Sequence, residues 1–330
     1  MTQSRDHGGG LDAAVARYGG ARGDWLDLST GINPAPYPVG DISADAWTAL
    51  PDKGAMDRLL GAARAFWNVP DGAAIVAANG ASAIIAKVPY LGPARGEVYV
   101  PTPTYNEHMA AFSATHQWVV AGPETADTHV YVHPNNPDGR EWDASNIGGR
   151  RLTVIDESFC DVTPACSHIA RAQDPGILVL KSFGKFWGLA GMRLGFAIGA
   201  PETLAPVTRR DGEGDTNHAT LADLLGPWAV AGPALETGAR ALMDMSWADA
   251  TRTRLKADAA RLDKLVDLPV VGGTDLFRLY EVADAAAAQE HLARNHVWSR
   301  RFPYSKTWLR LGLPAPDRWD QVAAAVNGLR

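Results

Sequence analysis

Apolar residues in this chain gather in short runs, and the runs alternate with segments of helical spacing. The runs predict strands at residues 74–77, 97–100, 118–121, 128–132, 152–156, 177–180 and 194–198. Helical spacing predicts helices at residues 44–67 and 83–89, and a further helix opening after residues 101–105. This alternation is typical of a mainly parallel sheet covered by helices on both faces. We therefore expect a three-layer α/β domain around a seven-stranded sheet.

The two ends of the chain follow other patterns. Residues 1–40 are rich in Gly and Pro and hold one short helical pattern, at residues 11–18, so we expect an arm that packs on the small C-terminal domain. Residues 41–235 form the predicted large domain. An amphipathic connecting helix at residues 234–266 leads into a smaller α+β domain, residues 236–330. That domain has apolar runs at residues 270–271, 276–280, 297–301 and 307–313, and a helical pattern at residues 285–294.

Composition narrows the function classes. With 330 residues, 46% of them hydrophobic, the chain can bury a sizeable core, and its net charge of −6 argues against nucleic acid or an anionic membrane as partner. The first ten residues contain no apolar signal region, and no run of about eighteen apolar residues occurs, so we expect a cytoplasmic protein. Cys160 and Cys166 match no zinc or redox spacing, which predicts reduced structural thiols and no metal site.

Candidate chemistry is densest around Ser182-x-x-Lys185, with Arg193 eight residues further on. Aromatic neighbours favour a partly desolvated Lys185, and desolvation lowers the pKa of an ammonium group and yields an amine able to form a Schiff base. Those neighbours are Phe183, Phe186 and Trp187. Ser182 and Arg193 are suited to hold a phosphate group. Amine and phosphate ligands together indicate pyridoxal phosphate, although Ser-x-x-Lys also opens the active-site helix of certain serine acylases and Gly-rich runs also occur in tight packing.

Other candidates stand at predicted strand ends, where α/β sheets bind their ligands. Asn79-Gly80-Ala81-Ser82 joins a strand to a helix start, which favours phosphate binding but also occurs without a ligand. Asp156 either caps a helix or pairs with a pyridine nitrogen and keeps the ring protonated as an electron sink. Tyr105 and Asn136 follow other strands. Residues 31–34 form a turn that either reaches a ligand or merely connects elements.

In this order, these motifs resemble the fold-type I pyridoxal-phosphate enzymes of the aminotransferase family, over essentially the whole chain. The set comprises residues 79–82, Tyr105, Asn135-Asn136-Pro137-x-Gly139, Asp156-Glu157, Ser182-x-x-Lys185 and Arg193. Within the family, residues 7–9, 29–34 and 226–230 are most similar to the threonine-phosphate decarboxylases of cobalamin synthesis, and histidinol-phosphate aminotransferases are close relatives. The resemblance implies an aspartate-aminotransferase-like large domain and a homodimer.

The resemblance also implies residue roles. Catalytic roles fall to Lys185, which holds the cofactor, Asp156, which pairs with its ring nitrogen, and Tyr105, which stacks on the ring. Further cofactor contacts would come from Gly80, Ala81, Ser82, Asn136, Ser182 and Arg193. Arg310 would bind the substrate carboxylate. The remaining substrate contacts would come from His7, Ser29, Gly31, Asn33, Asn136 and Arg300.

Three positions depart from the family pattern. Phe159 stands where many aminotransferases have a tyrosine, and the decarboxylase branch tolerates phenylalanine there. Leu50-Pro51 replaces a Tyr-Pro pair that commonly reaches the cofactor phosphate of the neighbouring subunit. Asp138 replaces a threonine in a turn.

These observations lead to two enzymatic hypotheses and one non-enzymatic hypothesis. The first is decarboxylation of L-threonine O-3-phosphate to (R)-1-amino-2-propanol O-phosphate by a lyase, which requires the bond to the carboxylate to stand perpendicular to the conjugated plane. The alternative is transamination of histidinol phosphate or a similar phosphorylated amine. A regulatory protein without turnover is disfavoured, because regulators with this fold carry a basic helix-turn-helix module that neither terminus shows.

Overall fold

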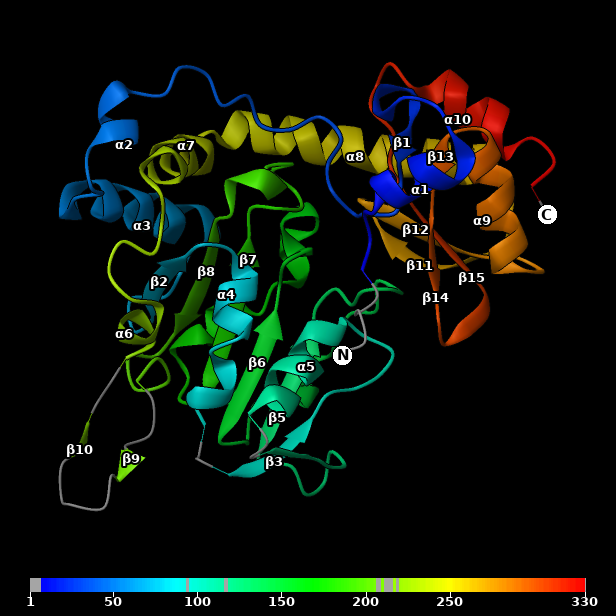
Figure 1. Cartoon of the computed structure of the whole chain (residues 1–330). Helices are drawn as coiled ribbons and strands as arrows, with labels where there is room; N and C mark the ends of the chain where they lie inside the picture. The colour runs from blue at the N-terminus through cyan, green and yellow to red at the C-terminus, as the bar shows by residue number, and fades with distance from the viewer. Residues whose placement is uncertain are drawn as a thin grey trace. The chain divides into compact units, whose positions relative to one another are not determined.

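The computed structural model describes residues 7–92, 95–115, 118–205, 209–210, 216–217 and 220–329 (Figure 1). These residues form two compact units. The small unit comprises the described parts of Met1–Pro36, Asn136–Arg140 and Ala248–Arg330, and the large unit comprises those of Tyr37–Asn135 and Glu141–Trp247. The domain boundaries given above stay predictions. Nowhere in the described part of the chain is a helix both long and apolar enough to cross a membrane.

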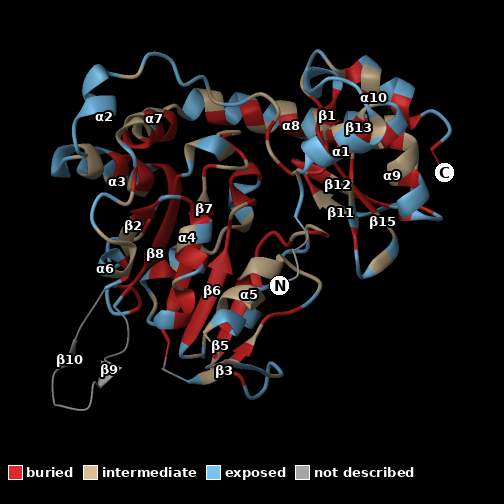
Figure 2. Ribbon diagram, in the orientation of Figure 1, coloured by how far each residue is buried: buried red, intermediate tan, exposed pale blue. Residues whose placement is uncertain are grey.

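A seven-stranded sheet in the order β2-β8-β7-β6-β5-β3-β4 forms the centre of the large unit. All its strands run in one direction except β8, which is antiparallel to both β2 and β7. This confirms the mainly parallel sheet. The strands are β2 (Ala74–Ala78), β3 (Gly96–Tyr99), β4 (Trp118–Val120), β5 (Thr128–Val132), β6 (Leu152–Asp156), β7 (Ile177–Ser182) and β8 (Gly195–Gly199). Figure 2 shows β6 and β8 buried along their whole length, as expected for central strands.

Helices of the large unit pack on this sheet and on one another, α4 against β8 and β7, and α3 against α7. They are α2 (Ala44–Thr48), α3 (Lys53–Trp67), α4 (Ala81–Ile85), α5 (Asn106–Ala114), α6 (Leu221–Leu225), α7 (Gly232–Met243) and the start of α8 (Met245–Val266). Short 3₁₀ helices are η2 (Val88–Tyr90), η3 (Ala144–Asn146), η4 (Cys160–Val162), η5 (Pro164–Cys166), η6 (Ile169–Gln173) and η7 (Ala190–Met192). A two-stranded hairpin joins β9 (Arg209–Arg210) to β10 (Thr216–Asn217).

Two of the long helices predicted from the sequence are each divided into two shorter helices in the structure. The helix predicted at residues 44–67 is interrupted before Pro51, which has no N–H to donate, and Asp52 then caps α3 by accepting from the N–H of Ala55 at 2.7 Å. The helix predicted at residues 234–266 ends at Met243. Asp244 leaves helical geometry, and its Oδ1 accepts from the N–H of Trp247 at 3.0 Å, which starts α8. Similarly, the helix predicted at residues 83–89 is α4 followed by η2.

The small unit is built on a four-stranded antiparallel sheet in the order β11-β12-β15-β14. Its strands are β11 (Val270–Thr274), β12 (Phe277–Glu281), β14 (Arg300–Phe302) and β15 (Ser305–Gly312). Its helices are α1 (Leu11–Tyr18), η1 (Arg22–Asp24), the remainder of α8, α9 (Ala285–Arg294) and α10 (Trp319–Val326). The N-terminal segment joins this unit through β1 (Leu26–Asp27), which pairs in parallel with β13 (Val297–Trp298). The single strand predicted at residues 297–301 is therefore two strands in two sheets.

Asp284 caps α9 with one side-chain oxygen, which accepts from the N–H groups of Ala286 at 2.8 Å and Ala287 at 3.1 Å. Asp284→Ala is expected to lower the free energy of unfolding by about 1 kcal/mol, because these amides then lose their partner. Asp284→Asn, whose side-chain oxygen can still accept these hydrogen bonds, should lower the free energy of unfolding by only about a few tenths of a kcal/mol. Urea denaturation of the three proteins measures the difference, and equal midpoints for alanine and wild type would contradict it.

Candidate active site

Four of the predicted cofactor residues lie at one edge of the large unit's sheet. Because β2, β6 and β7 run in the same direction, their ends lie at the same edge, where Gly80 follows β2, Asp156 ends β6 and Ser182 ends β7. The antiparallel β8 begins at that edge, and Arg193 precedes its first residue by two positions. Gly195 confirms this alignment, since it pairs with both Ala78 and Ser182.

The structure distinguishes the two lysines of this region. The ammonium group of Lys181 is fully buried, 2.6 Å from Glu157 and 3.5 Å from Asp161. Burial by itself lowers the pKa of Lys181, but the attraction of these acidic neighbours outweighs burial and raises it. Lys181 is therefore a structural cation and not a nucleophilic amine.

Lys185 lies in the turn after β7, and its Nζ is 5.2 Å from the centre of the Phe159 ring. The aromatic residues next to it in the sequence belong instead to the core, where each is fully buried: Phe183, Phe186 and Trp187. The side chain of Lys185 itself is half-buried. Phe159, at the position where many aminotransferases have tyrosine, thus lends an aromatic face to the amine and has no hydroxyl to donate.

Asp156 is buried at the end of β6 and is held from two sides. One carboxylate oxygen is 2.8 Å from Nε2 of His108, and the other accepts from the N–H of Ser158 at 3.0 Å and from its hydroxyl at 2.5 Å. Burial raises the pKa of Asp156, but the hydrogen bonds from His108 and Ser158 outweigh burial and lower it. The site therefore keeps a buried carboxylate charged, as a partner for a protonated ring nitrogen must be.

Tyr105 lies near both the carboxylate and the predicted phosphate ligands. Burial, followed by the charge of Asp156, raises the pKa of the Tyr105 hydroxyl, which is hydrogen-bonded to Ser82 and near the guanidinium of Arg193. The phenol therefore stays neutral. Tyr105 precedes α5, and Asn135 fixes this loop by accepting from Thr104 at 2.6 Å and donating to the carbonyl of Pro103 at 3.0 Å.

Glycines leave room around the start of α4. A Cβ on Gly80, whose φ is +98°, would lie 2.6 Å from the guanidinium of Arg193, and one on Gly195 would lie 2.3 Å from the amide nitrogen of Ala81. Only glycine permits both the backbone angle and these approaches. Together with Ser82 and Ser182, the arginine and the first amides of α4 form a set of donors suited to a phosphate group.

The predicted carboxylate ligand, Arg310, lies in the central strand β15 of the small unit and is 4% exposed. It donates to the side-chain oxygen of Asn136 and, at 2.8 Å, to the carbonyl of Ser29. Its Nε is buried and has no hydrogen-bond partner among the described residues. Arg300 stands directly opposite on β14. Burial, followed by repulsion from Arg300, lowers the pKa of Arg310 to about 9.

A buried, partly unsatisfied guanidinium beside a second cation is a site for an anion, because an anion would satisfy its free N–H and offset the repulsion. Two phenylalanine rings flank the Arg310 guanidinium, with centroids 4.9 Å and 5.9 Å away. They belong to Phe277 and Phe302. The described ion pairs of the small unit include none to Arg310.

The other predicted substrate residues are found in the N-terminal segment of the same unit. Ser29 is buried, and its hydroxyl donates to Asp27 at 2.6 Å and accepts from the N–H of Gly9 at 2.7 Å. Asn33 is also buried, and its side-chain oxygen accepts from Arg254 at 2.7 Å. Gly31 is buried between them, whereas His7 is exposed. The hydroxyl of Ser29 and the amide oxygen of Asn33 thus hold the segment in place.

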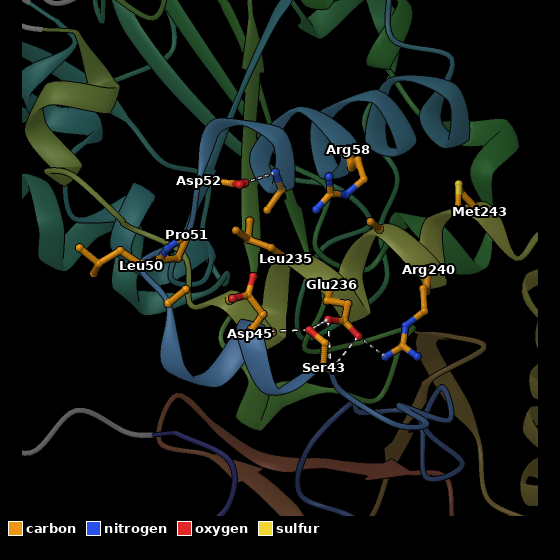
Figure 3. Close-up of a pocket in the computed structure, with 15 residues that line it drawn as sticks. Ser43, Asp45, Leu50, Pro51, Asp52, Arg58, Leu235, Glu236, Arg240 and Met243 are labelled. Carbon is orange, nitrogen blue, oxygen red and sulfur yellow. Dashed lines mark hydrogen bonds and ion pairs between the residues drawn. The ribbon is translucent and has the colours of Figure 1, made fainter.

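A pocket of about 340 Å³ between α2, α3 and α7 contains none of the predicted cofactor or substrate residues (Figure 3). Leu50 and Pro51 line it, and Figure 3 shows Ser43 and Arg240 converging on Glu236. Leu50 is 67% exposed. The Leu50-Pro51 position therefore belongs to an open surface of the large unit.

The model of the family "Aminotransferase class I and II" matches residues 130–326. The chain belongs to this family. It is 39% identical to the threonine-phosphate decarboxylase of Sinorhizobium sp., with 94% of this chain and 93% of the relative covered. The threonine-phosphate decarboxylase of Pseudomonas aeruginosa is 35% identical, with 98% of both chains covered. Histidinol-phosphate aminotransferase from Sinorhizobium meliloti, solved in complex with pyridoxal-5'-phosphate, has the same fold, with a TM-score of 0.78 at 16% identity over 98% of this chain and 95% of that one.

Sequence reasoning missed several supporting residues. His108, on α5, lies three positions after Tyr105, so helical spacing places the two residues on the same side of the helix. That spacing was the available signal that His108 would approach Asp156 along with Tyr105. The buried group of Glu157, Asp161 and Lys181 had no local signal. Trp67 and Trp187 donate to Asp161 at 2.9 Å and 3.1 Å and complete that group, which anchors the strands next to the site.

Proposed function

We propose that this protein is a pyridoxal-phosphate-dependent lyase that decarboxylates L-threonine O-3-phosphate to (R)-1-amino-2-propanol O-phosphate, a step of cobalamin synthesis. The observation that carries the proposal is the similarity to two threonine-phosphate decarboxylases along nearly the whole of each chain. The burial of Asp156 beside His108 and the opposition of Arg300 and Arg310 support the proposal.

The donor set of the large unit fits pyridoxal phosphate. Lys185 would hold the cofactor covalently, Asp156 would keep its ring nitrogen protonated, and the ring of Tyr105 would pack on it. The phosphate would be held by Ser82, Ser182, Arg193 and the amides of Gly80–Ser82, where a Cβ would close the space. Bound there, the cofactor supplies an electron sink for the pair released when the carboxylate leaves as carbon dioxide.

The small unit supplies anion contacts for a substrate with two anionic groups. Arg310 binds the carboxylate through its unsatisfied Nε. Asn136, whose side-chain oxygen accepts from Arg310, would help to orient the substrate. Arg300 on β14 and His7 would bind the phosphate ester, and Ser29, Gly31 and Asn33 shape the N-terminal segment that carries His7. Anchoring both ends of the substrate fixes which bond at its central carbon stands perpendicular to the ring.

Incubation of the purified protein with threonine phosphate tests the proposal. Release of carbon dioxide together with a phosphorylated amino alcohol is the expected result. Formation of a keto product from histidinol phosphate with a 2-oxo acid, without carbon dioxide from threonine phosphate, would instead establish the transaminase alternative. No turnover of either substrate by the cofactor-loaded protein would contradict both.

Arg300→Ala is expected to lower kcat/KM for threonine phosphate by roughly tenfold to a hundredfold, mainly by raising KM, because one charge-assisted contact is worth about 1.5–3 kcal/mol. Arg301→Ala is the matched control. It lies next to Arg300 on β14 but is exposed, and it donates to Gln289 at 3.0 Å. Steady-state kinetics with both variants measure the difference. Equal activity of the wild type on threonine and on its phosphate would show that no phosphate site exists.

We also propose a homodimer. Large apolar side chains are exposed here: Leu50 and Met243, which line the pocket of Figure 3, are 67% and 70% exposed, and Trp47 on α2 is 67% exposed. Such clusters commonly mark protein contacts. Sedimentation at micromolar concentration should give twice the chain mass, and a monomer would contradict it. A cytoplasmic location is proposed because the substrate and cofactor are charged phosphate esters, which do not cross a bilayer unaided.

A further inference from the structure

The chain's only two cysteines are six residues apart in the sequence, and the structure brings their sulfur atoms to 3.6 Å. Cys160 begins η4 and Cys166 ends η5, and both sulfur atoms converge on the carbonyl of Thr163, at 3.8 Å and 3.0 Å. A disulfide requires sulfur atoms about 2.05 Å apart, so closure needs a further approach of about 1.5 Å. The two turns already aim the thiols at each other.

The two thiols differ in access. Cys160 is fully buried, whereas Cys166 is half-exposed and lines an open pocket of the large unit. His133 and Trp142 also line this pocket. A small oxidant from solution therefore reaches Cys166 first, with Cys160 behind it.

The environment of Cys166 favours its thiolate. The hydrogen bond with Cys160, helped by His133, outweighs the effect of burial and lowers the pKa of Cys166 to about 6. The same hydrogen bond, together with burial, raises the pKa of Cys160. Cys166 is thus the nucleophile of the pair, and Cys160 retains its proton.

A metal ion is the competing explanation, because ligand atoms of His133, Cys160 and Cys166 all lie within 4.8 Å of one another. The hydrogen bonds of His133 oppose it. The N–H of Trp142 donates to Nδ1 at 2.9 Å, so the ring proton is on Nε2, which donates to the carbonyl of Cys166 at 2.8 Å. Coordination through Nε2 would require an anionic imidazolate or the loss of both bonds. His133 therefore serves as a donor to Cys166 and not as a metal ligand.

The loop that carries the pair is fixed at both ends by Glu157. Its carboxylate accepts from the hydroxyl of Ser167 at 2.6 Å and the N–H of His168 at 2.6 Å, and it pairs with Lys181. Residues 157 and 167–168 are thereby held together, so the cysteines remain close whichever oxidation state they adopt. Closure then requires the two sulfur atoms, 3.6 Å apart, to approach within this fixed loop.

We propose that Cys160 and Cys166 are an oxidant-sensitive dithiol that hydrogen peroxide converts to an intramolecular disulfide and that thiols restore. The Cys166 thiolate attacks a peroxide oxygen, an S–O bond forms, and the O–O bond breaks to release hydroxide. The Cys160 sulfur then attacks the Cys166 sulfur, the S–O bond breaks, and a second hydroxide leaves. With the two thiol protons, both hydroxides become water, so two thiols are oxidised as one peroxide is reduced to two waters.

Oxidation of the full-length protein by one equivalent of hydrogen peroxide tests the proposal. Titratable thiols should fall from two to none, the tryptic peptide of residues 152–171, which contains both cysteines, should lose two hydrogens in the monomeric chain, and dithiothreitol should restore both thiols. Cys160→Ala should accumulate a sulfenic acid at Cys166 that dimedone traps. In the native wild type, iodoacetamide should label Cys166 at least about tenfold faster than Cys160, a result that does not depend on any variant folding.

Three outcomes would overturn the proposal. One is retention of both thiols at a peroxide concentration that oxidises free cysteine. Another is a disulfide formed only between chains. The third is binding of one Zn²⁺ per chain, from the metal alone at micromolar concentration, with protection of both thiols from iodoacetamide.

Discussion

The Lys185→Ala variant is expected to lose both the visible absorbance of bound pyridoxal phosphate and all measurable decarboxylation of threonine phosphate. The reason is that Lys185 supplies the amine facing Phe159. The other lysine of the region, Lys181, is a cation held in ion pairs with Glu157 and Asp161 and cannot replace it. Removal of the amine removes both the covalent attachment and the group that moves protons beside the reacting carbon. We expect a loss of at least about 10⁴-fold in kcat, more than 5 kcal/mol in the barrier.

Borohydride treatment of the wild type should attach the cofactor covalently to the peptide that contains Lys185, and the variant should yield no adduct. Lys53→Ala is the control, since Lys53 is 88% exposed and its one ion pair among the described residues is with Asp57, one turn along α3. It should keep wild-type absorbance and activity. An undiminished borohydride adduct in Lys185→Ala would disprove the assignment.

The Asp156→Asn variant should keep much of its cofactor but lose most turnover. The amide oxygen can still accept from Ser158, so the fold is retained, but a neutral amide cannot stabilise a protonated ring nitrogen. A charged contact of this kind is worth roughly 2–4 kcal/mol, which predicts a fall in kcat of about thirtyfold to nearly a thousandfold. Absorbance titration measures cofactor binding, and single-turnover kinetics measure the chemical step.

The pH dependence follows from the lowered pKa of Asp156. A carboxyl group whose pKa is lower in the folded state than in the unfolded state stabilises the native state at pH values above its unfolded-state pKa. This stabilisation is lost as the pH falls through the folded-state pKa. Because that pKa lies below the usual 3.8, the carboxylate stays charged throughout the neutral range. If kcat fell on acidification with an apparent pKa near 6, and this fall were absent in Asp156→Asn, the carboxylate would not stay charged as expected. Unchanged kinetics in the variant would contradict the role of Asp156 in turnover.

The strands and the ordered motifs were predictable from the sequence, because both depend on neighbours in the chain. The apolar runs at residues 128–132 and 152–156 match β5 and β6 residue for residue, since central strands are buried on both faces. The positions of Asp156 and Ser182 at strand ends follow from the same runs. The family followed from motifs of a few residues each.

Tertiary structure decided what depends on contacts between distant residues. Helical spacing alone could not reveal that Asp244 would turn its side chain to the N–H of Trp247 and separate α7 from α8. Likewise, no periodicity indicates that the chain changes sheets at Ser299, which places Arg300 opposite Arg310, the two arginines of the proposed anion site. The approach of the two cysteines is also tertiary in origin, because consecutive 3₁₀ turns and the Glu157 contacts fix that loop, whereas a six-residue spacing does not.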